Sequence, residues 1–125
     1  MQLSLNSIII FVEDLTVLEH FYVDILNLQV VEKIENQWLL LSAGGMTLGL
    51  HRIKEEPEEA SSSKVVYHSN TKIIFEVNQD LEVLRTDLLA KQVKLREIVT
   101  WDGYDYWLCD GEDPEGNVFQ LKQKK

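Results

Sequence analysis

Short β-branched apolar runs alternate with helical patterns along the chain, and the same order occurs twice. The first run, residues 7–12, is bounded by polar residues and predicts a buried strand. Asp14 then suits the N-cap of a helix, and Asn27 suits its left-handed C-cap. Between these caps the apolar residues follow the spacing of one helical face: Leu15, Leu18, Phe21, Tyr22 and Ile25.

Three more strands are predicted before the middle of the chain, at residues 29–33, 37–42 and 46–51. Glu35-Asn36 and Gly44-Gly45 supply turn residues between them, and the glycine pair is the stronger hairpin signal. Residues 52–70 are rich in acidic residues and serine and contain Pro57, so they predict a linker.

The pattern then starts again. Residues 72–77 predict a strand in which Val77 takes the place of Val12, and Asp80 predicts the N-cap of a second helix. The apolar positions of that helix are Leu81, Val83, Leu84, Leu88 and Leu89. Strands are predicted at 93–99, 104–109 and 118–122. Neither half alone buries enough apolar surface to be stable, so we expect one α+β domain with repeats at about 3–51 and 71–122.

Several local motifs accompany this doubled β-α-β-β-β order. They are Val12-Glu-Asp-Leu15, Phe21-Tyr22, Leu26-Asn-Leu28 and the turn Asp113-Pro-Glu-Gly-Asn117. In this order and spacing they resemble the vicinal oxygen chelate superfamily of glyoxalases, bleomycin-resistance proteins and extradiol dioxygenases. The resemblance runs from about residue 3 to 122, and the motif glycine before Leu28 is replaced by Asn27. It implies two βαβββ repeats that form a half-open, curved mixed sheet.

The charge balance limits the classes of partner that the protein is expected to bind. Lys and Arg number 12 against 21 Asp and Glu, a formal net charge of −9, which disfavours nucleic acid and anionic membranes. We expect a cytoplasmic protein, because the N-terminus lacks the basic segment of a signal peptide and no apolar run could cross a bilayer. Cys109 is the only cysteine, and we interpret it as a small strand-end residue in preference to a nucleophile.

The resemblance also implies where metal ligands would lie. In metal-dependent members, His or Glu residues from both halves converge on a divalent ion. The matching positions here are Ser7, Gly49, Lys72 and Gln120. A protonated lysine only donates and glycine has no side chain, so we expect no metal cofactor. A divalent metal would require a shifted register. His51 shares a face with Gly49, but it lies too far along the strand to replace it.

The concave side of the sheet is expected to be lined by Ser7, Ile9, Phe11, Trp38, Leu40, Thr47, Gly49, His51, Lys72, Ile74, Glu76 and Gln120. These side chains either fill a closed core or border a ligand cavity. Buried charge is costly, so Lys72 and Glu76 either pair with each other or meet polar groups of a ligand. The missing side chain of Gly49 is expected to leave room in that cavity.

Residues 100–108 gather four aromatic residues and two acids. Trp101 and Tyr104, beside Asp102 and Asp105, are expected to form a rim that suits a flat, aromatic or cationic ligand. In its acidity and aromatic content the chain resembles the superfamily's metal-free antibiotic-binding members.

The leading hypothesis is therefore a metal-free protein that binds a small organic molecule and works as a homodimer. The competing hypothesis is a glyoxalase-like lyase or dioxygenase-like oxidoreductase. It requires a shifted ligand set that uses His51 and Glu76, or chemistry by Lys72. A structural or regulatory domain without a small ligand is the third possibility.

Overall fold

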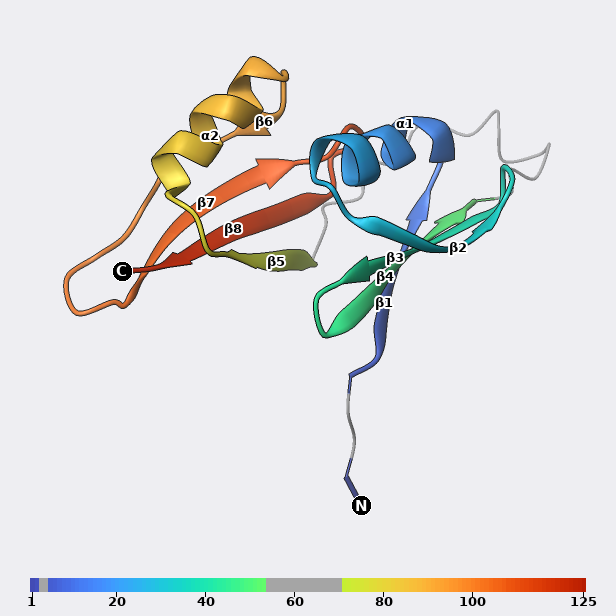
Figure 1. Ribbon diagram of the computed structural model, residues 1–125, viewed down its shortest axis with the longest axis horizontal. Coiled ribbons are helices and arrows are strands. Elements are labelled where there is room, and N and C mark those ends of the chain that lie inside the picture. Colours follow the sequence, from blue (N-terminus) through green and yellow to red (C-terminus); the bar gives the residue numbers. More distant parts are fainter. Residues whose placement is uncertain (3–4, 54–70) are drawn as a thin grey trace, which may run out of the picture. The chain divides into compact units, whose positions relative to one another are not determined.

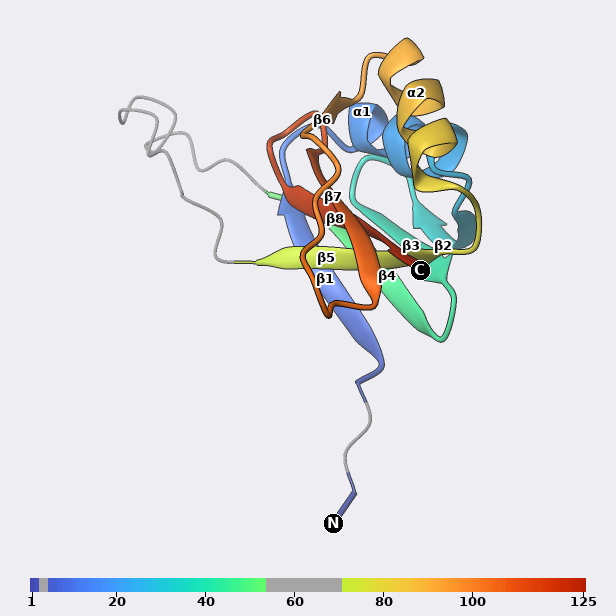
Figure 2. The ribbon, with the colours of Figure 1, turned by 90° about the vertical axis from the view of Figure 1, so that its left-hand side faces the viewer.

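The computed structural model describes residues 1–2, 5–53 and 71–125. The predicted linker therefore lies almost wholly outside the described residues, as does His68. The chain divides into two compact units, Met1–Val66 and Tyr67–Lys125. Each unit contains one four-stranded sheet and one helical segment, drawn in Figures 1 and 2. None of the helices in the described ranges is long and apolar enough to cross a membrane.

The first sheet contains β1 (Ser7–Val12), β2 (Gln29–Ile34), β3 (Trp38–Ala43) and β4 (Met46–Arg52). Its strand order is β1-β4-β3-β2, with β1 parallel to β4 and the other neighbours antiparallel. All four strands were predicted, and each of the last three extends slightly beyond its expected C-terminal end. The parallel pairing of β1 and β4 is possible because the helical segment carries the chain across the sheet.

The first helix begins as predicted and then widens. The Asp14 side chain accepts a hydrogen bond from the Val17 amide and caps α1 (Leu15–Glu19). The helix continues as the π-helix η1 (His20–Ile25), in which the Leu26 amide bonds to the Phe21 carbonyl. Asn27 ends it with φ of 62°, the left-handed C-cap conformation that was expected. The adjacent rings of Phe21 and Tyr22 are both buried, in agreement with their place on the predicted apolar face.

The helix packs on β3 and β4, as Figure 1 shows. The buried side chains of the sheet are Val12, Leu39, Leu41, Leu48 and Leu50, which alternate along their strands. The intervening residues occupy the opposite face. The helix therefore covers one face and leaves free the face that carries the predicted site residues of this unit.

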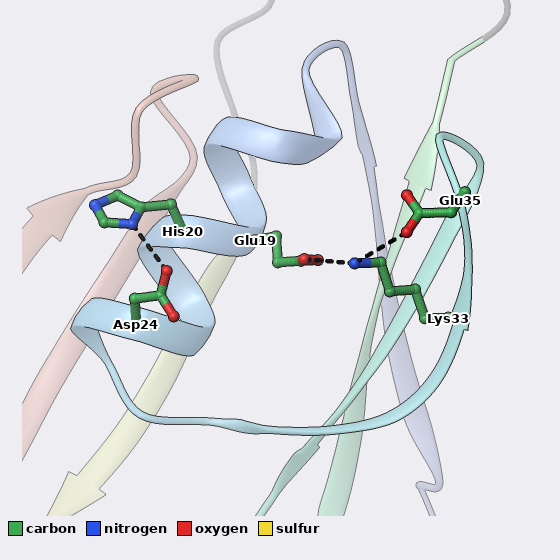
Figure 3. Close-up of polar contacts among 5 residues, drawn as sticks. All are labelled: Glu19, His20, Asp24, Lys33 and Glu35. Atoms are coloured by element: carbon green, nitrogen blue, oxygen red, sulfur yellow. Dashed lines mark hydrogen bonds and ion pairs between the residues drawn. The ribbon is translucent and has the colours of Figure 1, made fainter.

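Two residues of this helical segment, Glu19 and His20, form ion pairs at the surface (Figure 3). Lys33 Nζ on β2 lies 2.9 Å from Glu19 Oε1 and 3.4 Å from Glu35 Oε1. His20 Nδ1 lies 2.9 Å from Asp24 Oδ2, with 67% of the histidine side chain exposed. His20 is thus a surface residue.

The second sheet contains β5 (Lys72–Val77), β6 (Lys94–Leu95), β7 (Tyr106–Glu112) and β8 (Val118–Lys124). Its order, β5-β8-β7-β6, repeats that of the first sheet. The strand predicted at 93–99 is shorter than expected. It is reduced to β6 and an isolated bridge between Val99 and Leu108. The next strand starts later than expected because residues 101–104 form a turn, with Gly103 at φ of 80°.

Helix α2 (Leu81–Ala90) packs on β6, β7 and β8. Asp80 caps it as predicted and accepts hydrogen bonds from the Glu82 and Val83 amides. Leu81 and Leu88 are buried, but Val83 is 56% exposed and Leu89 is 41% exposed. The apolar stripe is therefore narrower than the sequence suggested, because a short helix on the rim of a small sheet covers only one row of side chains.

Candidate functional site

The face of the first sheet turned away from α1, here called the first open face, carries the predicted ligand-binding residues of that unit. Three cross-strand rows run over β1, β4 and β3. They are Ser7, Thr47 and Ser42; Ile9, Gly49 and Leu40; and Phe11, His51 and Trp38. Because side chains alternate along a strand, all nine residues lie on one face.

An aromatic row crosses this face. The ring centroids of Phe11 and His51 are 5.6 Å apart, and those of Trp38 and His51 are 6.0 Å apart, both in edge-to-face arrangements. Phe11 is 63% exposed, so this row is a surface and not a closed core. Edge-to-face aromatic pairs contribute a small attraction in addition to the free energy gained by burying their apolar surface.

Gly49 is covered by the tryptophan of the same face. A Cβ built on Gly49 would lie 2.4 Å from Trp38 Cη2 and 3.3 Å from Ile9 Cγ1. The expectation that Gly49 leaves room for a ligand is therefore wrong, because the indole ring already occupies the space above it. Glycine is needed here to let the ring lie against the backbone.

The hydroxyl group of Ser7 is also engaged in hydrogen bonds. Its hydroxyl donates to Asn6 Oδ1 at 2.7 Å and shares a hydrogen bond with the Thr47 hydroxyl on β4. The contact links β1 to β4 at the end of the sheet where the chain enters it.

The face of the second sheet turned away from α2, the second open face, carries Lys72, Glu76 and Gln120. Lys72 Nζ lies 2.8 Å from Asp110 Oδ2, and Gln120 Nε2 donates to Asp110 Oδ1, also at 2.8 Å. Of the two alternatives for Lys72, pairing with Glu76 is wrong, because residues four apart on a strand are separated by about 13 Å. Asp110 on β7, two strands away from Lys72, supplies the partner instead.

Asp110 is held in its charged form by these contacts. Partial burial alone would raise the pKa of this carboxyl, but the hydrogen bonds from Lys72 and Gln120 outweigh it and lower the pKa below its usual value. Both oxygens of the carboxylate are thus engaged, one by Lys72 on β5 and the other by Gln120 on β8.

The aromatic residues before and at the start of β7 form a second cluster. Trp101 stacks on Tyr104 with centroids 4.2 Å apart, and Tyr104 lies 5.8 Å from Tyr106. Lys122 Nζ lies 3.9 Å above the Tyr106 ring. Trp101 and Tyr104 are brought together as predicted, but they stack on each other, so each offers a ligand at most its outer face.

Sequence reasoning missed Asp110. The predicted strand stopped at Cys109, whereas β7 continues to Glu112. Alternation counted from Tyr106 through Leu108 would have placed Asp110 on the open face, opposite Gln120. Cys109 points the other way. It is fully buried, its thiol contacts the Arg96 carbonyl, and burial raises its pKa, which agrees with a structural role.

The contacts of the four positions that would hold a divalent ion leave no suitable set of metal ligands there. Gly49 has no donor and lies beneath the indole ring. Lys72 and Gln120 direct their nitrogen atoms to Asp110, and Ser7 is bonded to Asn6 and Thr47. Among the described residues, no group of three or more His, Cys, Asp or Glu side chains could hold a metal. These residues do not fit a divalent ion.

The doubled βαβββ topology is that of the vicinal oxygen chelate proteins, and the chain has this α+β fold. Lactoylglutathione lyase from Agrobacterium tumefaciens matches with a TM-score of 0.73 and 19% identity, over 96% of this chain and 92% of that one. The fosfomycin resistance protein FosX from Listeria monocytogenes matches with a TM-score of 0.77 and 13% identity, over 100% of this chain and 96% of that one.

A protein assigned to the glyoxalase family, from Bacillus anthracis, gives a TM-score of 0.75 at 11% identity, over 100% of this chain and 98% of that one. No protein-family model matches the sequence, and no curated protein matches it either. Identities this low establish the fold, and the function has to be argued from the residues of the site.

Proposed function

We propose that this chain is a metal-free, cytoplasmic binding protein for a small organic molecule with a flat aromatic portion. The observation that carries the proposal is the aromatic row of Phe11, His51 and Trp38 on the first open face. An exposed run of rings offers a ligand both apolar area and stacking, at little cost in side-chain entropy.

The metal-free part of the proposal rests on the donor set. Ser7, Gly49, Lys72 and Gln120 stand where the fold would offer ligands, and their atoms are committed to other contacts or absent. A binding role therefore suits these residues better than metal-assisted lyase or dioxygenase chemistry, which needs converging imidazole or carboxylate donors.

Two measurements test the proposal. Elemental analysis of protein purified without a metal-affinity tag should find no stoichiometric transition metal, and near-stoichiometric Ni, Zn, Mn or Fe would refute the metal-free claim. A thermal-shift screen with neutral, anionic and cationic aromatic compounds should find ligands that raise the melting temperature by a few degrees, because binding to the native state stabilises it.

A pair of exposed apolar residues provides the matched variants. Phe11→Ala should remove most of the ligand-induced rise in melting temperature, while Val83→Ala on α2, which truncates a residue of similar exposure, should leave it intact. Equal responses in the two variants, or no stabilising compound at all, would refute binding on the first open face.

A further inference from the structure

A polar trio with an ion pair occupies the second open face at positions that carry no charge on the first open face. Lys72, Asp110 and Gln120 come from three neighbouring strands, and Gln120 lies in register between Ile74 and Asp110. The counterparts of the trio in the first sheet are Ser7, Leu40 and Gly49, none of which is charged. The fold therefore does not require an ion pair here, since its other copy is assembled without one.

The ion pair of the trio is partly exposed and contributes little to stability. Replacing an ion pair by apolar side chains is often neutral or stabilising, so a pair kept on a partly buried face calls for another explanation. Gln120 is only 9% exposed, and its amide nitrogen is used to hold Asp110. Asp110 in turn holds Lys72, whose side chain is 42% exposed. The result is a cation fixed in place on an accessible face.

The ammonium group of Lys72 has hydrogen-bond donors that Asp110 does not use. A lysine ammonium carries three N–H groups, and one of them is directed to Asp110 Oδ2. Among the described residues this carboxylate is its only partner. Two N–H groups therefore remain for a hydrogen-bond acceptor, and the neighbouring Ile74 is 55% exposed on the same face.

We propose that Lys72 binds the carboxylate of a small organic acid whose apolar body lies against Ile74. This inference goes beyond the proposed function, because it adds a ligand site on the second sheet. A charge-assisted hydrogen bond from a prepositioned ammonium favours a carboxylate over a neutral amide of the same shape. The acidic residues near Trp101 suggested a cationic ligand from sequence, whereas the group that meets Lys72 has the opposite charge.

The test is a titration of the ¹⁵N-labelled full chain with benzoate and with benzamide, followed by NMR. Benzoate should give saturable shifts of the Asp110 and Gln120 amides, and benzamide should bind more weakly. Lys72→Met should weaken benzoate binding about tenfold or more, the effect expected for loss of one charged hydrogen bond. Lys72→Arg should retain most of it.

Lys33→Met is the matched control. Lys33 forms an ion pair of similar length with Glu19, at 2.9 Å, and its side chain is similarly exposed, at 40%. This variant loses the same charge and the same kind of contact, on β2 of the first sheet, and should bind benzoate as the unchanged chain does. If Lys72→Met gives a poorly dispersed spectrum, Lys72→Arg and Lys72→Gln take its place, and loss of benzoate binding only in Lys72→Gln is expected.

Equal benzoate affinity with and without the Lys72 ammonium would overturn the inference, and so would the absence of any saturable response to benzoate. Neither result would by itself refute the proposed function. Stabilisation by neutral aromatic compounds in the thermal-shift screen, lost in Phe11→Ala, would leave that function standing without the site at Lys72.

Discussion

At the scale of single residues, the contact between Gly49 and Trp38 decides which groups the first open face can hold. A side chain at position 49 must displace the indole ring or be displaced by it. We predict that Gly49→Ala lowers the free energy of unfolding by about 1–2 kcal/mol, since overpacking of this kind costs roughly 1–3 kcal/mol.

Chemical denaturation measures this change in unfolding free energy, and two further variants show whether it arises from the clash with Trp38. Gly45→Ala is the control, because a Cβ at Gly45 would meet nothing within 4 Å. In the background of Trp38→Ala the same change at Gly49 should cost little, because the clash is gone. An additive double mutant would mean that the cost arises from the backbone and not from the ring.

Asp110 gives a residue-scale prediction about pH. Its folded pKa is lowered, so its ionised form contributes stability above the unfolded pKa, and this contribution is lost as pH falls through the folded value. Asp110→Asn should therefore destabilise the protein by about 1 kcal/mol near neutral pH, in the range of a hydrogen-bonded surface pair.

Thermal melts of both proteins between neutral pH and pH about 3 test this, because the difference should shrink once the unfolded carboxyl of about pKa 3.9 is protonated. A difference that stays constant across this range would show that packing, and not ionisation, accounts for the effect. Glu97→Gln, at an exposed position with a longer contact to Arg85, should show little change at either pH.

Local signals made some residues predictable and others not. Asp14, Asp80 and Asn27 act within a few residues of themselves, so their capping roles could be predicted from the sequence and are confirmed. The partner of Lys72 could not, because it depends on how far β7 extends and on its register with β8. The same holds for Trp38, whose ring covers a glycine on the neighbouring strand.

At the scale of elements, the strands with the strongest apolar runs were predicted to the residue. The bounds of β1 and β5 agree with the structure because both apolar runs are bounded by polar residues. The expected full burial of β1 is wrong, since Phe11 on its open face is 63% exposed. The short β6 and the π-helical η1 were not foreseen. Neither has a distinct local signal, since the apolar spacing of residues 15–25 also fits an ordinary α-helix and the extent of β6 is set by its pairing with β7.

The end of the first helix supports an element-scale prediction. Asn27 has φ of 62°, a conformation that costs residues with a Cβ about 1–2 kcal/mol relative to glycine. Asn27→Ala should lower the unfolding free energy by about 1 kcal/mol, because alanine lacks the local hydrogen bonding that lets asparagine tolerate this region.

Denaturant titration of Asn27→Ala and Asn27→Gly provides the comparison. The glycine variant should be as stable as the unchanged chain or slightly more stable, since glycine adopts positive φ without strain. A loss of stability in the glycine variant equal to that of alanine would assign the role to the asparagine side chain and not to the backbone.

At the scale of the whole molecule, the repeated topology was predictable because it occurs twice in the chain. Each half gives its own strand and helix signals, and the two sets agree in order. The chemistry of the two open faces was less predictable. One face is aromatic and the other charged, and this difference depends on a few positions whose meaning appears only once the registers are known.

We also propose that the chain forms a homodimer, because Val30, Val31 and Ile34 of the edge strand β2 are 45%, 55% and 53% exposed. Sedimentation should give the mass of a dimer, and Val31→Glu should shift it towards the monomer of 14.5 kDa. Val83→Glu, on a helix surface of similar exposure, should not. A monomer at all concentrations would exclude the dimer.

The shared register of the two sheets has a practical consequence. Position 40 corresponds to position 110, and position 49 to position 120. Each repeat is therefore an internal reference for the other. A side chain can be transplanted to its counterpart on the same kind of backbone, so that effects of the scaffold are separated from effects of side-chain chemistry. Lys, Asp and Gln placed at 7, 40 and 49, with Trp38 truncated, would ask whether the recognition chemistry of one repeat can be installed in the other.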